Sequence, residues 1–151
     1  MVAPLPPFVA PAGATIEVAL AFDDGYWAPT YATMRSICIS THHPHQVRFH
    51  LLHRTLTPEH QDAIASIGRD YGAVLNFINL DHLDILDKRI ERFPNVTDKR
   101  LNKIVYARLF LGHLLDPAIE RVLYLDSDIF VRVPLDPFFF MDMEGHAIGA
   151  V

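Results

Sequence analysis

The stretch Arg121-Val-Leu-Tyr-Leu-Asp126-Ser-Asp128-Ile-Phe-Val131 passes from an apolar segment into two carboxylates and back into apolar residues. An apolar run of this kind is typical of a buried strand that ends at the edge of a sheet. Ligands of open α/β sheets bind where loops leave the carboxyl ends of the strands. The stretch therefore predicts an α/β fold with a site at Asp126 and Asp128.

Asp126 and Asp128 have a spacing that suits a cation site. In an extended chain alternate residues share a face, so both carboxylates point the same way, and a turn at Ser127 also lets them converge. Two neighbouring like charges favour a cation nearby, and hard divalent ions prefer oxygen ligands. A solvated strand end with an aspartate turn cap explains the same pattern, so both interpretations stay open at this point.

Strand-like and helix-like segments alternate along the chain. Thr57 and Pro58 predict a helix start, Gly72 predicts its end, and Asn102 is expected to cap a later helix. Residues 79–102 are otherwise expected to be irregular or short-helical. The alternation predicts a mostly parallel sheet with helices on both faces and right-handed crossovers. The predicted strands are 16–22, 47–53, 73–78 and a strand from 122, and the predicted helices are 29–40, 57–71 and 104–115.

Length and composition indicate one domain. The 151 residues are 50% hydrophobic and carry a net charge of −5 without a run of Lys or Arg, which argues against nucleic acid as a partner. The single Cys38 suits a reducing compartment, and no apolar run is long enough for a membrane span. We expect a flexible Pro-rich leader at 1–14 and a domain at 15–151. Because His146–Val151 predicts another strand, we expect this domain to be incomplete at its carboxyl end.

A second acidic group, Asp23-Asp24-Gly25-Tyr26, follows the first predicted strand. The carboxyl ends of parallel strands meet at one edge, so these acids are expected beside Asp126 and Asp128. The N–H groups of a nucleobase can donate to a carboxylate, and Tyr26 or Trp27 can stack on the base. An ordinary Asp/Gly turn is the alternative that stays open.

Arg108 lies at helical spacing with Ile104, Leu111 and Leu115, which predicts a guanidinium on the apolar face of its helix. A buried arginine needs a partner. A structural carboxylate such as Asp126 and a phosphate or carboxylate ligand are equal alternatives.

The histidines do not predict a metal site. His42, His43 and His45 lie in a Pro-containing loop, where we expect them to be solvated. His50 and His53 are three residues apart on a predicted strand and therefore point to opposite faces.

Three motifs, in this order and at these separations, resemble family 8 glycosyltransferases: Val-Ala-Leu-Ala-Phe-Asp-Asp-Gly-Tyr at 18–26, Tyr-Ala-Arg-Leu at 106–109 and Val-Leu-Tyr-Leu-Asp-Ser-Asp at 122–128. The resemblance covers 16–151 and implies a Rossmann-like GT-A fold. It also implies a retaining hexosyltransferase that takes galactose or glucose from a UDP-sugar, as in lipopolysaccharide outer-core enzymes and glycogenin. The implied acceptor is a saccharide or lipid-linked saccharide. The implied location is cytoplasmic, peripheral to the membrane through the missing part.

The resemblance implies roles for individual residues as well. Asp126 and Asp128 match ligands of Mn²⁺ (or Mg²⁺), and a third, histidine ligand belongs to a segment that this sequence lacks. Asp23 matches the uracil-binding acid, Gly25 replaces an asparagine common in bacterial galactosyltransferases, and Lys103 is an implied support for the reaction together with Arg108. The residues expected to bind the nucleotide sugar are Ala21, Asp23, Asp24, Gly25, Tyr26, Leu101, Arg108, Asp126, Ser127 and Asp128.

Two other classes are alternatives to a transferase. One is a module that binds nucleotide and metal without turnover. The other is a haloacid-dehalogenase-type phosphatase, in which an aspartate at a strand end is the nucleophile. The phosphatase pattern needs Gly and Thr soon after the second acid, where this chain has Ile129 and Phe130.

Overall fold

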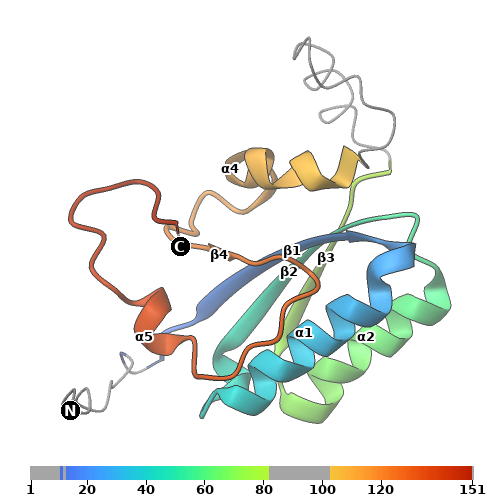
Figure 1. Cartoon of the computed structure of the whole chain (residues 1–151), viewed down its shortest axis with the longest axis horizontal. Helices are drawn as coiled ribbons and strands as arrows, with labels where there is room; N and C mark the ends of the chain where they lie inside the picture. The colour runs from blue at the N-terminus through green and yellow to red at the C-terminus, as the bar shows by residue number, and fades with distance from the viewer. Residues whose placement is uncertain (1–10, 12, 82–102, 151) are drawn as a thin grey trace, which may run out of the picture.

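One parallel sheet organises the molecule, of which the computed structural model describes residue 11 and residues 13–81 and 103–150. The strands lie in the order β3-β2-β1-β4, and every neighbouring pair is parallel. Helices α1 and α2 cover one face of the sheet, and α4 lies on the other (Figure 1). The predicted α/β architecture with both faces covered is confirmed. The strands are β1 (Ile16–Asp23), β2 (Val47–Arg54), β3 (Val74–Asn79) and β4 (Leu123–Tyr124).

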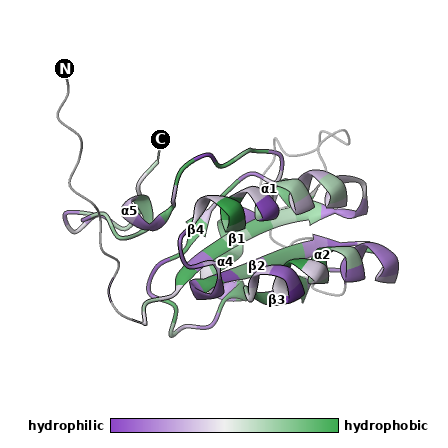
Figure 2. Ribbon diagram, turned by 90° about the horizontal axis from the view of Figure 1, so that it is seen from below, coloured by the Kyte–Doolittle hydropathy of each residue, from purple (hydrophilic) through white to green (hydrophobic). Residues whose placement is uncertain are grey.

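The central strand β1 divides its side chains between two hydrophobic clusters. Val18, Leu20 and Phe22 join the cluster under α1 and α2, whereas Ala19 joins a smaller cluster on the opposite face. This alternation follows from the two-residue period of a strand. Figure 2 shows mainly hydrophobic residues along β1 and hydrophilic residues on the outer turns of α2. Both faces of β1 are therefore buried over most of its length, and its partly exposed residues, Ala21 and Asp23, lie toward its carboxyl end.

Helices α1 (Trp27–Ser40) and α2 (Pro58–Tyr71) form the layer on the first face. A 3₁₀ turn at Asp24–Tyr26 leads directly into α1, so this helix begins two residues before the predicted start. The predicted signals of α2 are confirmed. The side chain of Thr57 accepts from the N–H of His60 at 3.4 Å, and Gly72 ends the helix with φ 72°.

The opposite face carries a 3₁₀ helix at Lys103–Phe110, followed by the short helix α4 (Leu111–Leu114). The predicted continuous α-helix at 104–115 is therefore wrong over most of its length. With three residues per turn, Ile104, Ala107 and Phe110 face the sheet and are buried. Arg108 consequently does not lie on the buried face, contrary to the prediction from α-helical spacing.

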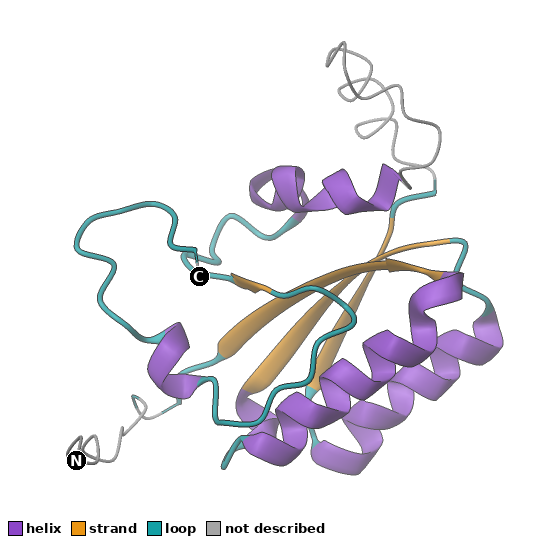
Figure 3. Ribbon diagram, in the orientation of Figure 1, coloured by secondary structure: helices purple, strands orange, loops and turns teal. Residues whose placement is uncertain are grey.

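Strand β4 is much shorter than its apolar sequence predicts. It pairs with β1 only at Val18 and Ala19, and the chain then leaves the sheet as a loop that runs back along α1 (Figure 3). A short helix α5 (Asp136–Phe139) follows. The strand predicted at 146–151 is absent from the described residues 146–150, where Ile148 is 84% exposed.

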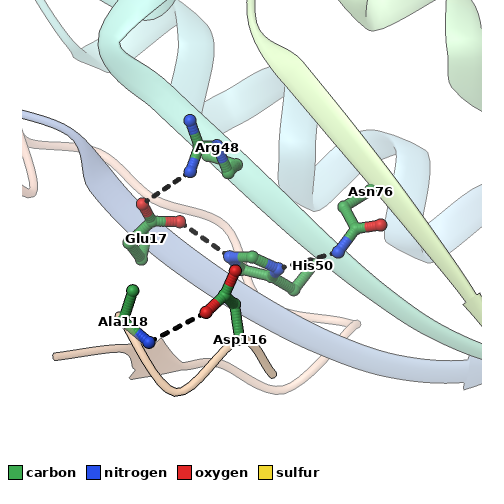
Figure 4. Close-up of polar contacts among 6 residues, drawn as sticks. All are labelled: Glu17, Arg48, His50, Asn76, Asp116 and Ala118. Carbon is green, nitrogen blue, oxygen red and sulfur yellow. Dashed lines mark hydrogen bonds and ion pairs between the residues drawn. The ribbon is translucent and has the colours of Figure 1, made fainter. Parts of the chain in front are cut away.

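A group of polar side chains, of which Glu17 and His50 are buried, lies near the amino end of β1 (Figure 4). Glu17 lies 2.7 Å from Nε2 of His50 and accepts from Arg48 at 3.3 Å, while Asn76 lies 3.3 Å from Nδ1 of His50. His53 contacts Phe22 and Phe77 on the other face, which confirms that the two strand histidines point in opposite directions. This polar group is at the end of the strands remote from the acidic motifs.

Several predictions concern residues outside the described ranges. They include the leader at 1–10 and 12, the segment 82–102, the cap at Asn102 and the binding residue Leu101. The division into a leader and a domain at 15–151 stays a prediction. Among the described helices, none combines the length and the hydropathy that crossing a membrane requires.

Candidate functional site

A pocket of about 410 Å³ opens at the carboxyl edge of the sheet. Its size falls in the range of small-ligand sites. The segments that line it come from the end of β1, the turn that follows, the 3₁₀ helix at 103–110 and the end of β4. The lining residues are Ala21, Phe22, Asp23, Tyr26, Ile104, Val105, Arg108, Tyr124, Asp126, Ser127 and Asp128.

Asp126 and Asp128 stand on either side of a buried serine. Ser127 donates to the carbonyl of Ala21 at 2.9 Å, which fixes the turn against β1. Both aspartates are exposed and line the pocket. This alternation brings both carboxylates to one opening, as predicted.

The donor set suits a hard divalent cation that shares its coordination with a ligand. Asp126 and Asp128 supply carboxylate oxygens, and no cluster of three or more His, Cys, Asp or Glu side chains able to hold a metal occurs within the described residues. Mg²⁺ and related ions commonly use one or two carboxylates plus substrate phosphates rather than an all-protein cage. The residues therefore fit a metal that is completed by phosphate oxygens and water.

Arg108 reaches across the pocket to the acidic pair. Its guanidinium donates to Asp126 at 3.1 Å and to the carbonyl of Val105 at 3.0 Å. The side chains of Arg108 and Asp126 are 44% and 57% exposed, so this is a surface ion pair. The structural partner considered from the sequence is confirmed, although the arginine is not buried.

Tyr124 is a pocket residue that the sequence analysis did not single out. The guanidinium carbon of Arg108 lies 4.7 Å from the centre of its ring, in a cation–π arrangement. Burial raises the pKa of Tyr124, and the positive charge of Arg108 opposes this shift. The signal was present in the sequence, because Tyr124, Asp126 and Asp128 follow the two-residue period of one strand face.

The turn after β1 splits its acidic residues between two environments. Asp23 and Tyr26 line the pocket, whereas Asp24 accepts from the N–H of Thr57 at 2.8 Å and lies 2.8 Å from Nδ1 of His60. The N–H of Thr57 and the imidazole of His60 lower the pKa of Asp24. These contacts tie the turn to the start of α2. They give Asp24 a structural task, and its predicted ligand contact stays a prediction.

Two further predicted residues, Gly25 and Lys103, are not among the residues that line the pocket. Gly25 is exposed and does not line the pocket. A Cβ at Gly25 would lie 3.3 Å from a carboxylate oxygen of Asp23, so a larger residue there would crowd that acid. Lys103 begins the 3₁₀ helix. Phe22, Ile104 and Val105 form apolar lining that the sequence did not identify as part of a site.

Comparison with known proteins gives relatives over most of the chain. Residues 17–151 match Glycosyl transferase family 8. Glycosyltransferase GlyF of Streptococcus pneumoniae is 32% identical over 135 residues, which cover 89% of this chain and 31% of GlyF. Probable galacturonosyltransferase-like 9 of Arabidopsis thaliana is 31% identical over 117 residues, which cover 77% of this chain and 30% of the relative. The chain thus spans about a third of these curated relatives.

Solved structures agree with the sequence matches. The galactosyltransferase LgtC in complex with donor and acceptor sugar analogues superposes with a TM-score of 0.67 and 29% identity, over 84% of this chain and 43% of LgtC. The bifunctional glycosyltransferase WbbM shares the fold with a TM-score of 0.66 at 17% identity. The α/β fold is therefore GT-A-like, as in LgtC, and the chain belongs to Glycosyl transferase family 8.

Proposed function

We propose that this chain forms the nucleotide-sugar-binding part of a retaining hexosyltransferase that uses a UDP-sugar and a divalent cation. The observation that carries the proposal is a pocket whose lining combines Asp23 and Tyr26 with Arg108, Asp126 and Asp128. A UDP-sugar has a base, a diphosphate and a sugar, and these residue types are complementary to all three. Family membership supports the transferase class and displaces the phosphatase alternative.

The chain's own residues divide the recognition between them. Asp23 accepts a hydrogen bond from the ring N–H of uracil, and Tyr26 packs on the base. Asp126 and Asp128 hold Mn²⁺ or Mg²⁺, which when bound stabilises the negative charge of the departing diphosphate. Arg108 holds Asp126 in place and presents its guanidinium to the phosphate or sugar. Ala21 and Ser127, joined by a hydrogen bond, complete the lining of the pocket.

The transferred sugar is galactose or glucose, and the acceptor is a saccharide or lipid-linked saccharide of the lipopolysaccharide type. LgtC supports galactose and a saccharide acceptor, because it is a galactosyltransferase whose structure holds donor and acceptor sugar analogues. A cytoplasmic enzyme that works at the membrane surface would meet both substrates. A second candidate is that the 151 residues by themselves bind nucleotide and metal without turnover.

Calorimetric titration with UDP tests the binding step. We expect UDP to bind more tightly with Mn²⁺ than without it, and ADP to bind more weakly than UDP. Asp23→Ala should weaken UDP binding by about 1–3 kcal/mol, the cost of losing a hydrogen bond to a charged group. Asp62→Asn, an exposed change on α2, is the matched control. Equal affinity for ADP and UDP would contradict the role of Asp23.

Turnover distinguishes the two candidates. Release of UDP from UDP-galactose or UDP-glucose, measured with and without a saccharide acceptor, is expected of the transferase. Metal-dependent UDP binding without any release of UDP would favour the module.

A further inference from the structure

Helix α1 holds the acidic segment through side-chain hydroxyls. Ser40 donates to the carbonyl of Val131 at 2.9 Å, and Ser36 accepts from the N–H of Val131 at 2.9 Å. Thr33 donates at 3.1 Å to the carbonyl of Ser127 and at 2.7 Å to the carbonyl of Ile129. Spacings of three and four residues put these hydroxyls on one face of the helix. The loop that runs back along α1 in Figure 3 is therefore bonded to it.

These bonds take over where the strand ladder stops. The last backbone bond from β4 toward β1 joins the N–H of Leu125 to the carbonyl of Ala19 at 3.1 Å. Beyond it, the backbone of residues 127–131 bonds to the hydroxyls of α1, while the side chains of Ser127 and Asp126 bond to Ala21 and Arg108. Buried carbonyls need donors, and without a neighbouring strand a side chain must supply them. The position of the two carboxylates thus depends on side chains rather than on sheet pairing.

Thr33 has the most direct connection to the acidic pair. Its two acceptors, Ser127 and Ile129, are the residues immediately before and after Asp128. The side chain of Thr33 is fully buried, with 0% exposure. One hydroxyl therefore fixes the backbone on both sides of Asp128 without approaching the pocket itself.

We propose that Thr33 is a positioning residue for the cation and diphosphate site, acting through the backbone that carries Asp128. This inference rests on the proposed function. Two exposed carboxylates are not fixed in position by packing. The affinity of such a site for a cation therefore depends on the contacts that hold the backbone of the two residues. Loss of the hydroxyl leaves two carbonyls without their donor and frees Asp128 to move.

Three variants of the intact protein separate positioning from packing. Thr33→Val has the same shape and lacks the hydroxyl, whereas Thr33→Ser keeps the hydroxyl and loses a methyl group. Thr30→Val is the matched control, because Thr30 lies on the same helix, is also 0% exposed and bonds within the helix to the carbonyl of Tyr26 at 2.7 Å. All three are compared by thermal melts, so that any loss of stability is known.

The first measurement needs no ligand. Amide hydrogen exchange of Val131, whose N–H donates to Ser36 in the same segment, should accelerate about tenfold in metal-free Thr33→Val, the factor expected when loss of roughly one hydrogen bond lets the segment open. It should stay close to wild type in Thr33→Ser and Thr30→Val. Unchanged exchange in Thr33→Val would overturn the inference.

The second measurement is titration of Mn²⁺ in the presence of UDP. Thr33→Val should lose affinity by about 10–100-fold, as for supporting partners of metal ligands, and Thr33→Ser should restore it. Equal losses in Thr33→Val and Thr30→Val would mean a general structural effect and would overturn the role of Thr33. If the wild type binds neither UDP nor Mn²⁺, the proposed function is wrong, and the exchange experiment still decides whether Thr33 holds the segment.

Discussion

Strand β1 is held in two different ways by its two neighbours. Against β2 it pairs along its whole length, Ile16–Asp23, whereas against β4 it pairs only at Val18 and Ala19. Backbone pairing depends little on side-chain identity, so the β1–β2 side tolerates polar changes that do not open the core. The segment 126–131 on the other side is fixed by individual hydroxyls. Asp126 and Asp128 therefore lie on the side of β1 that individual side-chain hydrogen bonds hold in place.

The largest expected effect contrasts these two sides by the same substitution. Phe49 in β2 is 0% exposed and Phe130 in the acidic segment is 72% exposed. Phe49→Ala should lower the free energy of unfolding by about 3–5 kcal/mol, because a large cavity is left in the core. Phe130→Ala should change it by less than about 0.5 kcal/mol. Urea denaturation measures both, and a comparable loss in Phe130→Ala would mean that the segment packs more firmly than its exposure indicates.

The acidic pair should behave in the opposite way, with a large effect on binding and a small effect on stability. Asp128→Asn should lower the affinity for Mn²⁺ in the presence of UDP by more than about 100-fold, since loss of a direct ligand exceeds the roughly 10–100-fold cost of a supporting partner. The midpoint of urea unfolding without metal should stay near wild type, because Asp128 is exposed. Asp62→Asn serves as the control, and unchanged Mn²⁺ affinity in Asp128→Asn would remove this residue from the metal site.

Arg108 tests whether the acidic edge needs a cation for stability. The sequence allows two outcomes for Arg108→Leu: a loss of stability that Mn²⁺ relieves if Arg108 offsets the acidic pair, and a loss that Mn²⁺ does not change if Arg108 only supports the core. The observed pair with Asp126 is exposed, so we now expect a loss below about 1 kcal/mol, with or without Mn²⁺. Arg69→Leu, which removes an exposed pair with Asp62, is the matched control for thermal melts. A large loss of stability that Mn²⁺ relieves would contradict this and would mean that Arg108 offsets the charge of Asp126 and Asp128.

Local signals in the sequence predicted the fold well. Thr57, Pro58 and Gly72 define α2 at both ends, because a cap and a terminator act within a few residues of their own position. The 3₁₀ helix at Lys103–Phe110 escaped prediction, since Ile104 begins both an α-helical and a three-residue apolar pattern. Only packing against the sheet chooses between the two patterns.

The sequence predicted the acidic residues of the candidate site but not the residues that hold them in position. Asp23, Asp126 and Asp128 follow predicted strands, so the parallel topology alone places them at one edge. Thr33 bonds to residues more than ninety positions away, and no sequence period links such partners. The contacts of Asp24 were likewise not predictable, because its bonds to Thr57 and His60 form only when α2 packs beside the turn.

The smallest expected effect concerns Asp24 and depends on pH. Its folded pKa is lowered below the ordinary value of 3.8, first by the N–H of Thr57 and then by His60. A lowered carboxyl pKa contributes stability above the unfolded value, and that contribution is lost as the pH falls through the folded pKa. Asp24→Asn should therefore be less stable than wild type at neutral pH, and the difference should shrink below pH 3.8.

Thermal melts of wild type and Asp24→Asn from neutral pH down to strongly acidic pH measure this difference. The variant Asp62→Asn provides the reference, because it removes an exposed carboxylate on α2, the helix to which Asp24 bonds. Because Asp24 ties the turn that carries Asp23 and Tyr26 to α2, weaker UDP binding should accompany the loss of stability at neutral pH. If the difference in stability between wild type and Asp24→Asn stays constant across the acidic range, the shape and hydrogen bonding of Asp24, and not its negative charge, stabilise the turn.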